Sequence, residues 1–225
     1  MSYNNGPKIV TNGLVLYLDA ANGRSYPGSG TTWTDISRNG KNGTLTNGPT
    51  FSSANRGSIV FDGTNDYVQC TGAMTVSSAT FIVWVYRNGN QNDYTGIFFS
   101  RGTNVTGLNI VTSHQLGYHW NDTSNTAGWN SSGLVIPSLQ WSLCAISVSP
   151  TFATAYLCQQ SGITSVVNNV SHASTTIDDV KIGQDEATGV RWFNGRVAMA
   201  QMYNRALSAS EIQQNYNATK GRFNL

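Results

Sequence analysis

The sequence predicts an all-β fold, a two-sheet antiparallel sandwich or jelly roll, and three observations lead to this prediction. Short segments rich in branched and aromatic side chains recur at close spacing, separated by Gly, Asn, Ser and Pro, as in sandwiches and barrels. Charged residues make up only 11% of the 225 residues, which excludes a coiled coil or long-helix protein. Aromatic residues make up another 11%, and this apolar mass excludes a disordered chain.

The first half of the chain alternates predicted strands with turn-rich segments. Residues 14–20 alternate apolar side chains with others, as a strand with one buried face does. Residues 22–43 are rich in Gly, Ser and Asn and are predicted to be a loop. Strands at 58–63 and 66–70 flank a Gly-Thr-Asn turn, and the apolar run at 79–87 predicts a strand buried on both faces.

The second half continues this pattern. Its predicted strands are 96–100, 107–113, 116–120, 139–149, 152–159, 179–184 and 191–204. A hairpin centred on Thr151 would place Cys144 opposite Cys158 on one face, because side chains alternate with a period of two. With Cys70 the chain has three cysteines, an odd and small number that does not fit a disulfide scaffold. We therefore expect all three thiols to be reduced.

One helix is predicted, at the C-terminal end. Ser208 and Glu211 have the spacing of a capping box, in which each side chain binds the backbone amide of the other residue. Leu207 and Ile212 flank this box at the positions of a hydrophobic staple. The helix is expected to end near Thr219, before a glycine.

Residues 13–225 are predicted to form one domain, and residues 1–12 an extended N-terminal arm. Tyr3 in this arm could anchor the protein in a pocket of a partner, or the arm could be a frayed terminus. The N-terminal segment lacks a basic region followed by an apolar one, so no signal peptide is expected. No apolar stretch approaches 18 residues and no Lys/Arg cluster occurs, so neither a membrane span nor nucleic-acid binding is expected.

Several motifs together resemble the laminin-G-like, concanavalin-A-like lectin/glucanase superfamily. They are, in order, GLVLYLDAAN, WTDISRNGKNGTLTNGPTF, GSIVFDGTNDYV, KIGQD and RWFNGRVAMAQMYNRALSASEI. The resemblance extends from about Gly13 to Tyr216. It implies a two-sheet antiparallel jelly roll of one laminin-G-like domain.

The resemblance raises the question of glycoside hydrolysis, because relatives hydrolyse glucans with a Glu-x-Asp-x-x-Glu strand. This chain has only two glutamates, Glu186 and Glu211, and the second belongs to the predicted capping box. The adjacent Asp178 and Asp179 would point to opposite faces of a strand. A nucleophile elbow, a Walker loop and a dinucleotide fingerprint are also missing from the sequence. We therefore expect the protein not to be an enzyme.

Lectin-like relatives often bind calcium through loop oxygens, and the resemblance leaves calcium open as a cofactor. The candidate ligands are Asp35, Asn65 and Asp66, which lie in turn-rich segments. The same residues would equally serve as caps of well-formed turns. The acidic residue that relatives often carry just after the Gly of the penultimate strand is missing in 195–199, where the sequence reads GRVAM.

Glycan binding requires aromatic rings beside hydrogen-bonding side chains. The candidates, in or beside predicted loops, are Tyr94, Trp120, Asn121, Trp129 and Trp192. The alternative for these tryptophans is that they cover the end of the core.

The resemblance and the surface composition, rich in Asn, Ser, Thr and Gly and poor in Lys and Glu, predict a virion protein of a tailed bacteriophage. It would be a capsid decoration protein or a fibre or appendage component, made in the host cytoplasm and bound to other virion proteins. The alternative is a lectin that binds a host or environmental polysaccharide, and a glycan hydrolase is the third hypothesis. Self-association is left open.

Overall fold

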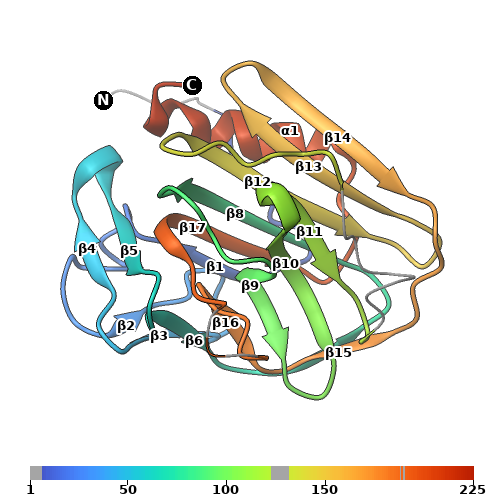
Figure 1. The fold of residues 1–225 in the computed structure, drawn as a ribbon, viewed down its shortest axis with the longest axis horizontal. Helices are drawn as coiled ribbons and strands as arrows, with labels where there is room; N and C mark the ends of the chain where they lie inside the picture. The colour runs from blue at the N-terminus through green and yellow to red at the C-terminus, as the bar shows by residue number, and fades with distance from the viewer. Residues whose placement is uncertain (1–6, 123–131, 188, 190) are drawn as a thin grey trace.

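A computed structural model describes residues 7–122, 132–187, 189 and 191–225. Two antiparallel sheets lie face to face, and one α-helix lies outside them (Figure 1). The predicted all-β sandwich with a single C-terminal helix is therefore confirmed. Within the described residues, no helix is long and apolar enough to cross a membrane.

The first sheet has eight strands. In spatial order they are β14 (Gly162–Asn168), β13 (Ala153–Gln159), β12 (Trp141–Val148), β8 (Ala79–Arg87), β17 (Asn194–Tyr203), β5 (Ser58–Asp62) and β4 (Thr50–Ser52), with β1 (Leu14–Asp19) paired to β17. The central strand, β8, was predicted to be buried on both faces, and all but one of its residues are buried.

The second sheet has seven strands. In spatial order they are β11 (Gln115–His119), β10 (Val105–Val111), β9 (Thr95–Arg101), β16 (Val180–Ile182), β6 (Tyr67–Cys70), β3 (Gly43–Thr46) and β2 (Thr32–Trp33). A small third sheet joins β15 (Thr175–Ile177) to β7 (Met74–Val76), and short 3-10 turns are η1 (Ala54–Arg56), η2 (Thr112–His114) and η3 (Lys220–Phe223). Residues 22–43, predicted to be entirely loop, contain β2, and several Ser/Thr-rich strands were not predicted, β14 among them.

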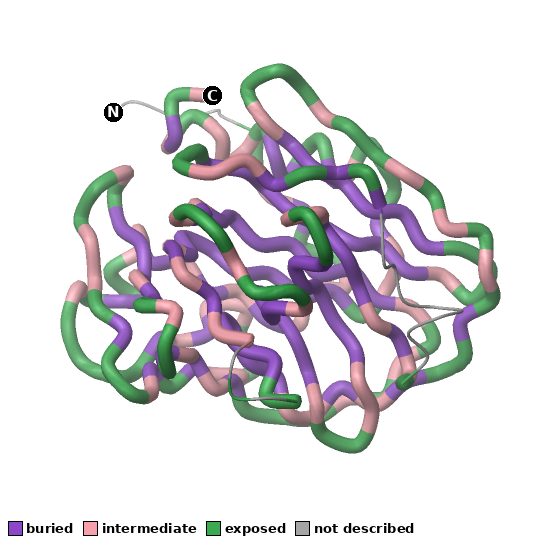
Figure 2. The backbone as a smooth tube through the Cα atoms, viewed as in Figure 1, coloured by how far each residue is buried: buried purple, intermediate pink, exposed green. Residues whose placement is uncertain are grey.

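The main core lies between the two large sheets (Figure 2). Aromatic side chains from both sheets meet there. For example, Phe81 of β8 and Phe98 of β9 contact each other edge to face, with ring centroids 5.2 Å apart. Such contacts fix the two sheets against each other.

A second core lies between the eight-stranded sheet and helix α1 (Ala209–Thr219). Trp84 of β8 is fully buried there, stacked on Tyr216 at 5.8 Å and tilted against Phe223 at 4.3 Å. Its indole Nε1 donates a hydrogen bond of 2.8 Å to Thr219 Oγ1. Strand β8 is apolar on both faces because it faces the main core on one side and this helix layer on the other.

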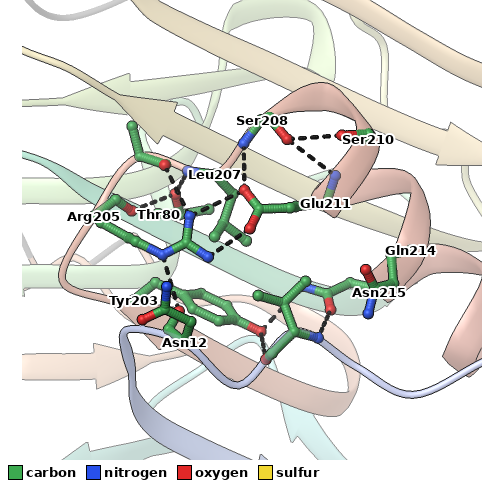
Figure 3. Close-up of polar contacts among 12 residues, drawn as sticks. Asn12, Thr80, Tyr203, Arg205, Leu207, Ser208, Ser210, Glu211, Gln214 and Asn215 are labelled. Atoms are coloured by element: carbon green, nitrogen blue, oxygen red, sulfur yellow. Dashed lines mark hydrogen bonds and ion pairs between the residues drawn. The ribbon is translucent and has the colours of Figure 1, made fainter.

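The start of α1 has the predicted capping box (Figure 3). Glu211 N donates to Ser208 Oγ, and Ser208 N donates to Glu211 Oε2. The Glu211 carboxylate also forms a bidentate ion pair with Arg205, at 3.0 and 2.6 Å. Thr80 Oγ1 accepts from Leu207 N and donates to Arg205 O, so the box is fastened to strand β8.

We expect this network to make stability depend on pH at the acid end. The hydrogen bond from Arg205, followed by that from Ser208 N, lowers the pKa of Glu211 from its ordinary 4.5 to about 2. A lowered pKa contributes stability above pH 4.5 that is lost as the pH falls toward 2. Chemical denaturation of wild type and Glu211→Gln should show a gap in unfolding free energy at pH 6 that closes near pH 2. A gap that stays constant over this range would contradict the assignment.

The described part of the N-terminal arm is held against α1 (Figure 3). Val10 is buried in the second core, its N donates to Asn215 Oδ1, and its O accepts from Tyr203 OH. Gln214 Nε2 donates to Lys8 O. The packing of the domain thus extends to residue 8, before the expected boundary at residue 13, because this segment supplies an apolar side chain to the helix layer. Tyr3 lies outside the described residues.

The hairpin between β12 and β13 differs from its predicted register by one residue. Leu143 pairs with Cys158 and Cys144 with Leu157, because Ser149 N donates to Phe152 O and closes a two-residue turn. A shift of one residue reverses the face of a side chain. Cys144 therefore lies in the main core and Cys158 in the helix layer, so the prediction that they share a face is wrong.

All three cysteines are free and buried, and we expect them to be unreactive in the folded protein. Burial raises the pKa of Cys70 and Cys158 to about 12 and raises that of Cys144 as well. The thiolate that an alkylating reagent needs is then scarce at neutral pH. Intact mass after iodoacetamide treatment should show no label on the native protein and three labels on the denatured protein. Labelling of the native protein, or fewer than three labels after denaturation without reductant, would contradict this.

Candidate functional site

A cluster of charged and aromatic side chains lies on the outer face of the seven-stranded sheet, away from the core. Strand alternation places them there: Val68 of β6 and Val180 of β16 face the core, so their neighbours Tyr67 and Lys181 face outward. We call this set the outer-face cluster. Its members are Tyr67, Gln69, Tyr94, Phe99, Arg101, His119, Asp179, Lys181, Asp185, Glu186, Arg191 and Trp192.

Lys181 is the centre of the first half of the cluster. Its Nζ contacts Asp179 Oδ2 at 3.0 Å and pairs with Glu186, and it lies 5.8 Å from the centroid of the Tyr67 ring. Burial alone would lower the pKa of Lys181, but the hydrogen bonds to Glu186 and Asp179 raise it above its ordinary value. Burial would raise the pKa of Asp179, yet the hydrogen bond from Lys181 keeps it below its usual range. Lys181 and Asp179 are therefore both charged at neutral pH.

Asp185 is the centre of the second half. Its side chain has no exposed surface, and its Oδ2 accepts from Arg101 Nη2 at 2.9 Å and from Arg191 Nη1 at 2.8 Å. Arg101 Nε and the Ala187 amide donate to Oδ1. A carboxylate without access to water needs such partners, so Asp185 fixes both guanidinium groups in place.

Two aromatic rings that were predicted to bind glycans belong to this cluster. The Tyr94 ring is half-buried and lies under the Arg191 guanidinium, 5.0 Å from ring centroid to Cζ. The Trp192 ring is also half-buried, 6.2 Å from the Tyr67 ring, and its Nε1 donates to Gly189 O. Both rings are thus oriented by neighbours while part of their surface stays accessible.

His119 completes the cluster on strand β11. Its ring contacts Phe99 edge to face at 5.6 Å, and Arg101 Cζ lies 5.7 Å from the centroid of the Phe99 ring. Burial is the main cause of the lowered pKa of His119. The imidazole is therefore neutral at pH 7 and can both donate and accept a hydrogen bond.

The other predicted glycan-binding residues lie elsewhere or outside the described chain. Trp120 has only 1% of its surface exposed and belongs to the main core, and its Nε1 donates to Ala173 O. Its ring therefore has no face that a sugar could reach, which corrects the prediction for this residue in favour of the core alternative. The backbone N of the half-buried Asn121 donates to Thr106 Oγ1 in the adjoining turn. Trp129 is not among the described residues.

Two of the three predicted calcium ligands, Asp35 and Asp66, serve as turn caps. Both carboxylate oxygens of Asp35 accept hydrogen bonds from the chain, from Tyr17 N and Ser37 N on Oδ1 and from Ser37 Oγ and Lys41 N on Oδ2. These donors occupy the oxygens that a hard cation would need. This arrangement therefore does not fit a calcium site.

The second pair of candidate ligands lies in the turn between β5 and β6. Asp66 is buried and accepts from Asp62 N, while the amides of Thr64 and Asn65 donate to Asp62 Oδ1. This turn carries the chain from one large sheet to the other, because β5 and β6 belong to different sheets. Within the described ranges no three His, Cys, Asp or Glu side chains are grouped so that they could hold a metal ion.

Sequence reasoning missed most of the charged members of the outer-face cluster. Arg101 and Asp185 lie 84 residues apart in the chain, so no local pattern joins them. Lys181 and Asp185 lie in the KIGQD motif, which was used only to identify the resemblance. Their alternation with the core-facing Ile182 is the one signal that could have placed Lys181 on the outer face.

Three solved structures show the same fold at low identity. Domain 4 of a GH43 extracellular arabinanase from Geobacillus stearothermophilus, in complex with arabinotriose, has a TM-score of 0.60 and 16% identity, over 91% of this chain and 98% of that one. A Trypanosoma rangeli sialidase complex has a TM-score of 0.64 and 15% identity, over 98% and 36%. A botulinum neurotoxin serotype D binding domain has a TM-score of 0.67 and 11% identity, over 94% and 52%.

The chain thus spans about a third of the sialidase and about half of the toxin domain, but nearly all of the arabinanase domain. No curated protein sequence matches it. Residues 62–213 match the model of the Laminin_G_3 family. This match covers more than half of the chain and agrees with its two antiparallel sheets, and the protein accordingly belongs to the concanavalin A-like lectin/glucanases superfamily.

Proposed function

We propose that this protein is a non-enzymatic carbohydrate-binding protein and that the outer-face cluster is its binding site. The observation that carries the proposal is a pair of half-buried rings on one sheet face: Tyr94 lies under the Arg191 guanidinium, and Trp192 lies beside the Tyr67 ring, which Lys181 contacts. Sugars present apolar ring faces and hydroxyl groups, and a site for them combines aromatic surface with a few positioned polar groups.

The charged residues are suited to hydroxyl recognition. The guanidinium of Arg191 donates, and the partly exposed carboxylates of Asp179 and Glu186 accept. Their positions are set before any ligand arrives, by Asp185 on one side and Lys181 on the other. Groups that are already ordered lose little freedom on binding, which favours affinity.

Two features support binding without hydrolysis. Among the described residues, Asp179 and Glu186 are the partly exposed carboxylates of the cluster, and both are ion-paired to the same lysine. A glycosidase needs one carboxylic acid held protonated beside a carboxylate, whereas the hydrogen bond from Lys181 favours the charged form of Asp179. The arabinanase domain that carries arabinotriose covers the same fold over nearly its full length.

We expect Trp192→Ala to weaken glycan binding at least about tenfold, since a stacking surface is lost, which corresponds to about 1.4 kcal/mol. Arg191→Ala should have a similar effect. The assay is affinity electrophoresis against neutral and acidic polysaccharides, followed by calorimetry with the best oligosaccharide and with arabinotriose. Phe152→Ala is the matched control, because Phe152 is 45% exposed and lies in the distant β12–β13 turn. Equal retention of Trp192→Ala and wild type, or no retention on any polysaccharide, would contradict the proposal.

A role on the surface of a bacteriophage virion is a second proposal. It is supported by the low charge of the chain, since polar and apolar contacts would then attach the protein to capsid or tail proteins. A virion component should copurify with particles at a fixed copy number. Variable or trace amounts in purified particles would contradict this role while leaving glycan binding intact.

A further inference from the structure

Strand β14 is the outermost strand of the eight-stranded sheet and, within the part of the chain that the structure describes, pairs with β13 alone (Figure 1). Its seven residues are exposed or half-buried throughout. In Figure 2 this edge has the colours of exposed and intermediate residues, whereas the neighbouring strands are mostly coloured as buried. The open side of such a strand presents backbone donors and acceptors that another strand can pair with.

Nothing in the sequence of this edge opposes pairing. Residues 159–177 contain no Asp, Glu, Lys, Arg or Pro, which are the residues that natural proteins use to block sheet edges. The other described edges are shorter or covered: β4 has three residues, β2 has two, and Gln115 of β11 is bridged to Val135. The long bare edge is therefore a particular feature of β14.

The outer face of β14 also has an apolar side chain without cover. Val167 is 49% exposed. Ile163 lies on the same face, because the two positions differ by four residues, and it packs on the helix layer. Ile163 and Ser165 line a groove of about 550 Å³ that continues along Tyr156 and α1. A second strand at this edge would lie at the mouth of that groove.

We propose that two copies of this protein pair through β14 in an antiparallel, twofold-symmetric arrangement. Pairing over the full strand centres on Ser165, so Ser165 faces its own copy, Thr164 faces Val166 and Ile163 faces Val167. The exposed Val167 of each copy is then covered by Ile163 of the other, an apolar cross-strand pair at the mouth of the groove. The two eight-stranded sheets become one continuous sheet.

The strand suits its own copy better than an unrelated strand for two reasons. A twofold interface brings each residue close to its own counterpart, so any charge near the centre would face a like charge. The complete lack of charge in residues 159–177 removes that repulsion. The side chains along β14 also match those of a second, antiparallel copy. The exposed Val167 of one strand then lies opposite the apolar Ile163 of the other.

The test uses light scattering after size exclusion and sedimentation velocity on the full chain. Wild type should have twice the mass of the 24.3 kDa chain, and Ser165→Lys and Val167→Lys should each have the mass of one chain. Val135→Lys is the matched control and should stay dimeric, because it adds the same charge at a valine that is 50% exposed and bridged to β11 of the other large sheet. A monomeric wild type would overturn the proposal and leave the edge to a strand of another protein. A Val167→Lys variant that remains dimeric would overturn it too.

A cross-link identifies the register. In the proposed pairing the two Ser165 Cα atoms are directly opposite, within the range of about 4.4–6.8 Å that a disulfide spans. Mild oxidation of Ser165→Cys should give a covalent dimer on non-reducing gels. Thr164→Cys should not form this cross-link, because each Thr164 lies opposite Val166 of the other copy, two residues away from the other Thr164. Cross-linking of Thr164→Cys alone would contradict the register, and neither result depends on glycan binding.

Discussion

Replacement of Trp84 by alanine should destabilise the protein by about 3–5 kcal/mol, the cost of deleting a fully buried tryptophan from a core. Trp84 lies between the eight-stranded sheet and the C-terminal segment, where it contacts Tyr216 and Phe223 and donates to Thr219. The substitution therefore removes the contacts that hold α1 and η3 to the sheet. Helix α1 itself has 11 residues, too few for a stable helix in water without packing.

Urea unfolding at pH 7, followed by tryptophan fluorescence and far-ultraviolet circular dichroism, measures this effect. Trp192→Ala is the matched control, because its ring is half-buried on the outer face and its loss should cost only about 1 kcal/mol. If the two variants unfold at the same urea concentration, the assignment of Trp84 to the helix layer is wrong. Trp84→Phe should recover part of the loss, since a phenyl ring keeps the stack but not the hydrogen bond.

The strands were predictable where packing follows the local pattern. The run from 79 to 87 is apolar at every core position, because one face meets the other sheet and one meets α1. The capping box was predictable for the same reason, since Ser208 and Glu211 are neighbours in the helix. Strand β14 was missed because its Ser, Thr and Gly residues at an open edge carry neither alternation nor an apolar run.

The site was only partly predictable. Aromatic residues in polar loops are visible in a sequence, and Tyr94 and Trp192 do lie together with charged groups on one face. Their exposure is not visible, which is why Trp120 was placed with them although it fills the core. The ion pairs that organise the cluster join strands far apart in the chain, such as Arg101 with Asp185, and only the folded sheets bring them together.

Replacement of both arginines that contact Asp185 should cause the second large loss of unfolding free energy. In the double variant Arg101→Met/Arg191→Met, the Asp185 carboxylate still accepts the hydrogen bond from the Ala187 amide, but it loses both ion pairs. A buried ionised group left without its partner costs about 3–5 kcal/mol. Each single substitution should cost much less, because one arginine still pairs with the carboxylate. The loss in the double variant should therefore exceed the sum of the two single losses.

Addition of Asp185→Asn to the double variant separates charge from packing. The amide has the same shape as the carboxylate but no charge, so the triple variant should recover most of the lost unfolding free energy at pH 7. Asp179→Asn is the matched control, since its side chain is 30% exposed and solvent replaces the lost contact. If the triple variant is no more stable than the double one, the arginines act through packing rather than through the buried charge. Glycan affinity should not recover with stability, because the guanidinium of Arg191, which we assign to hydroxyl recognition, is still missing.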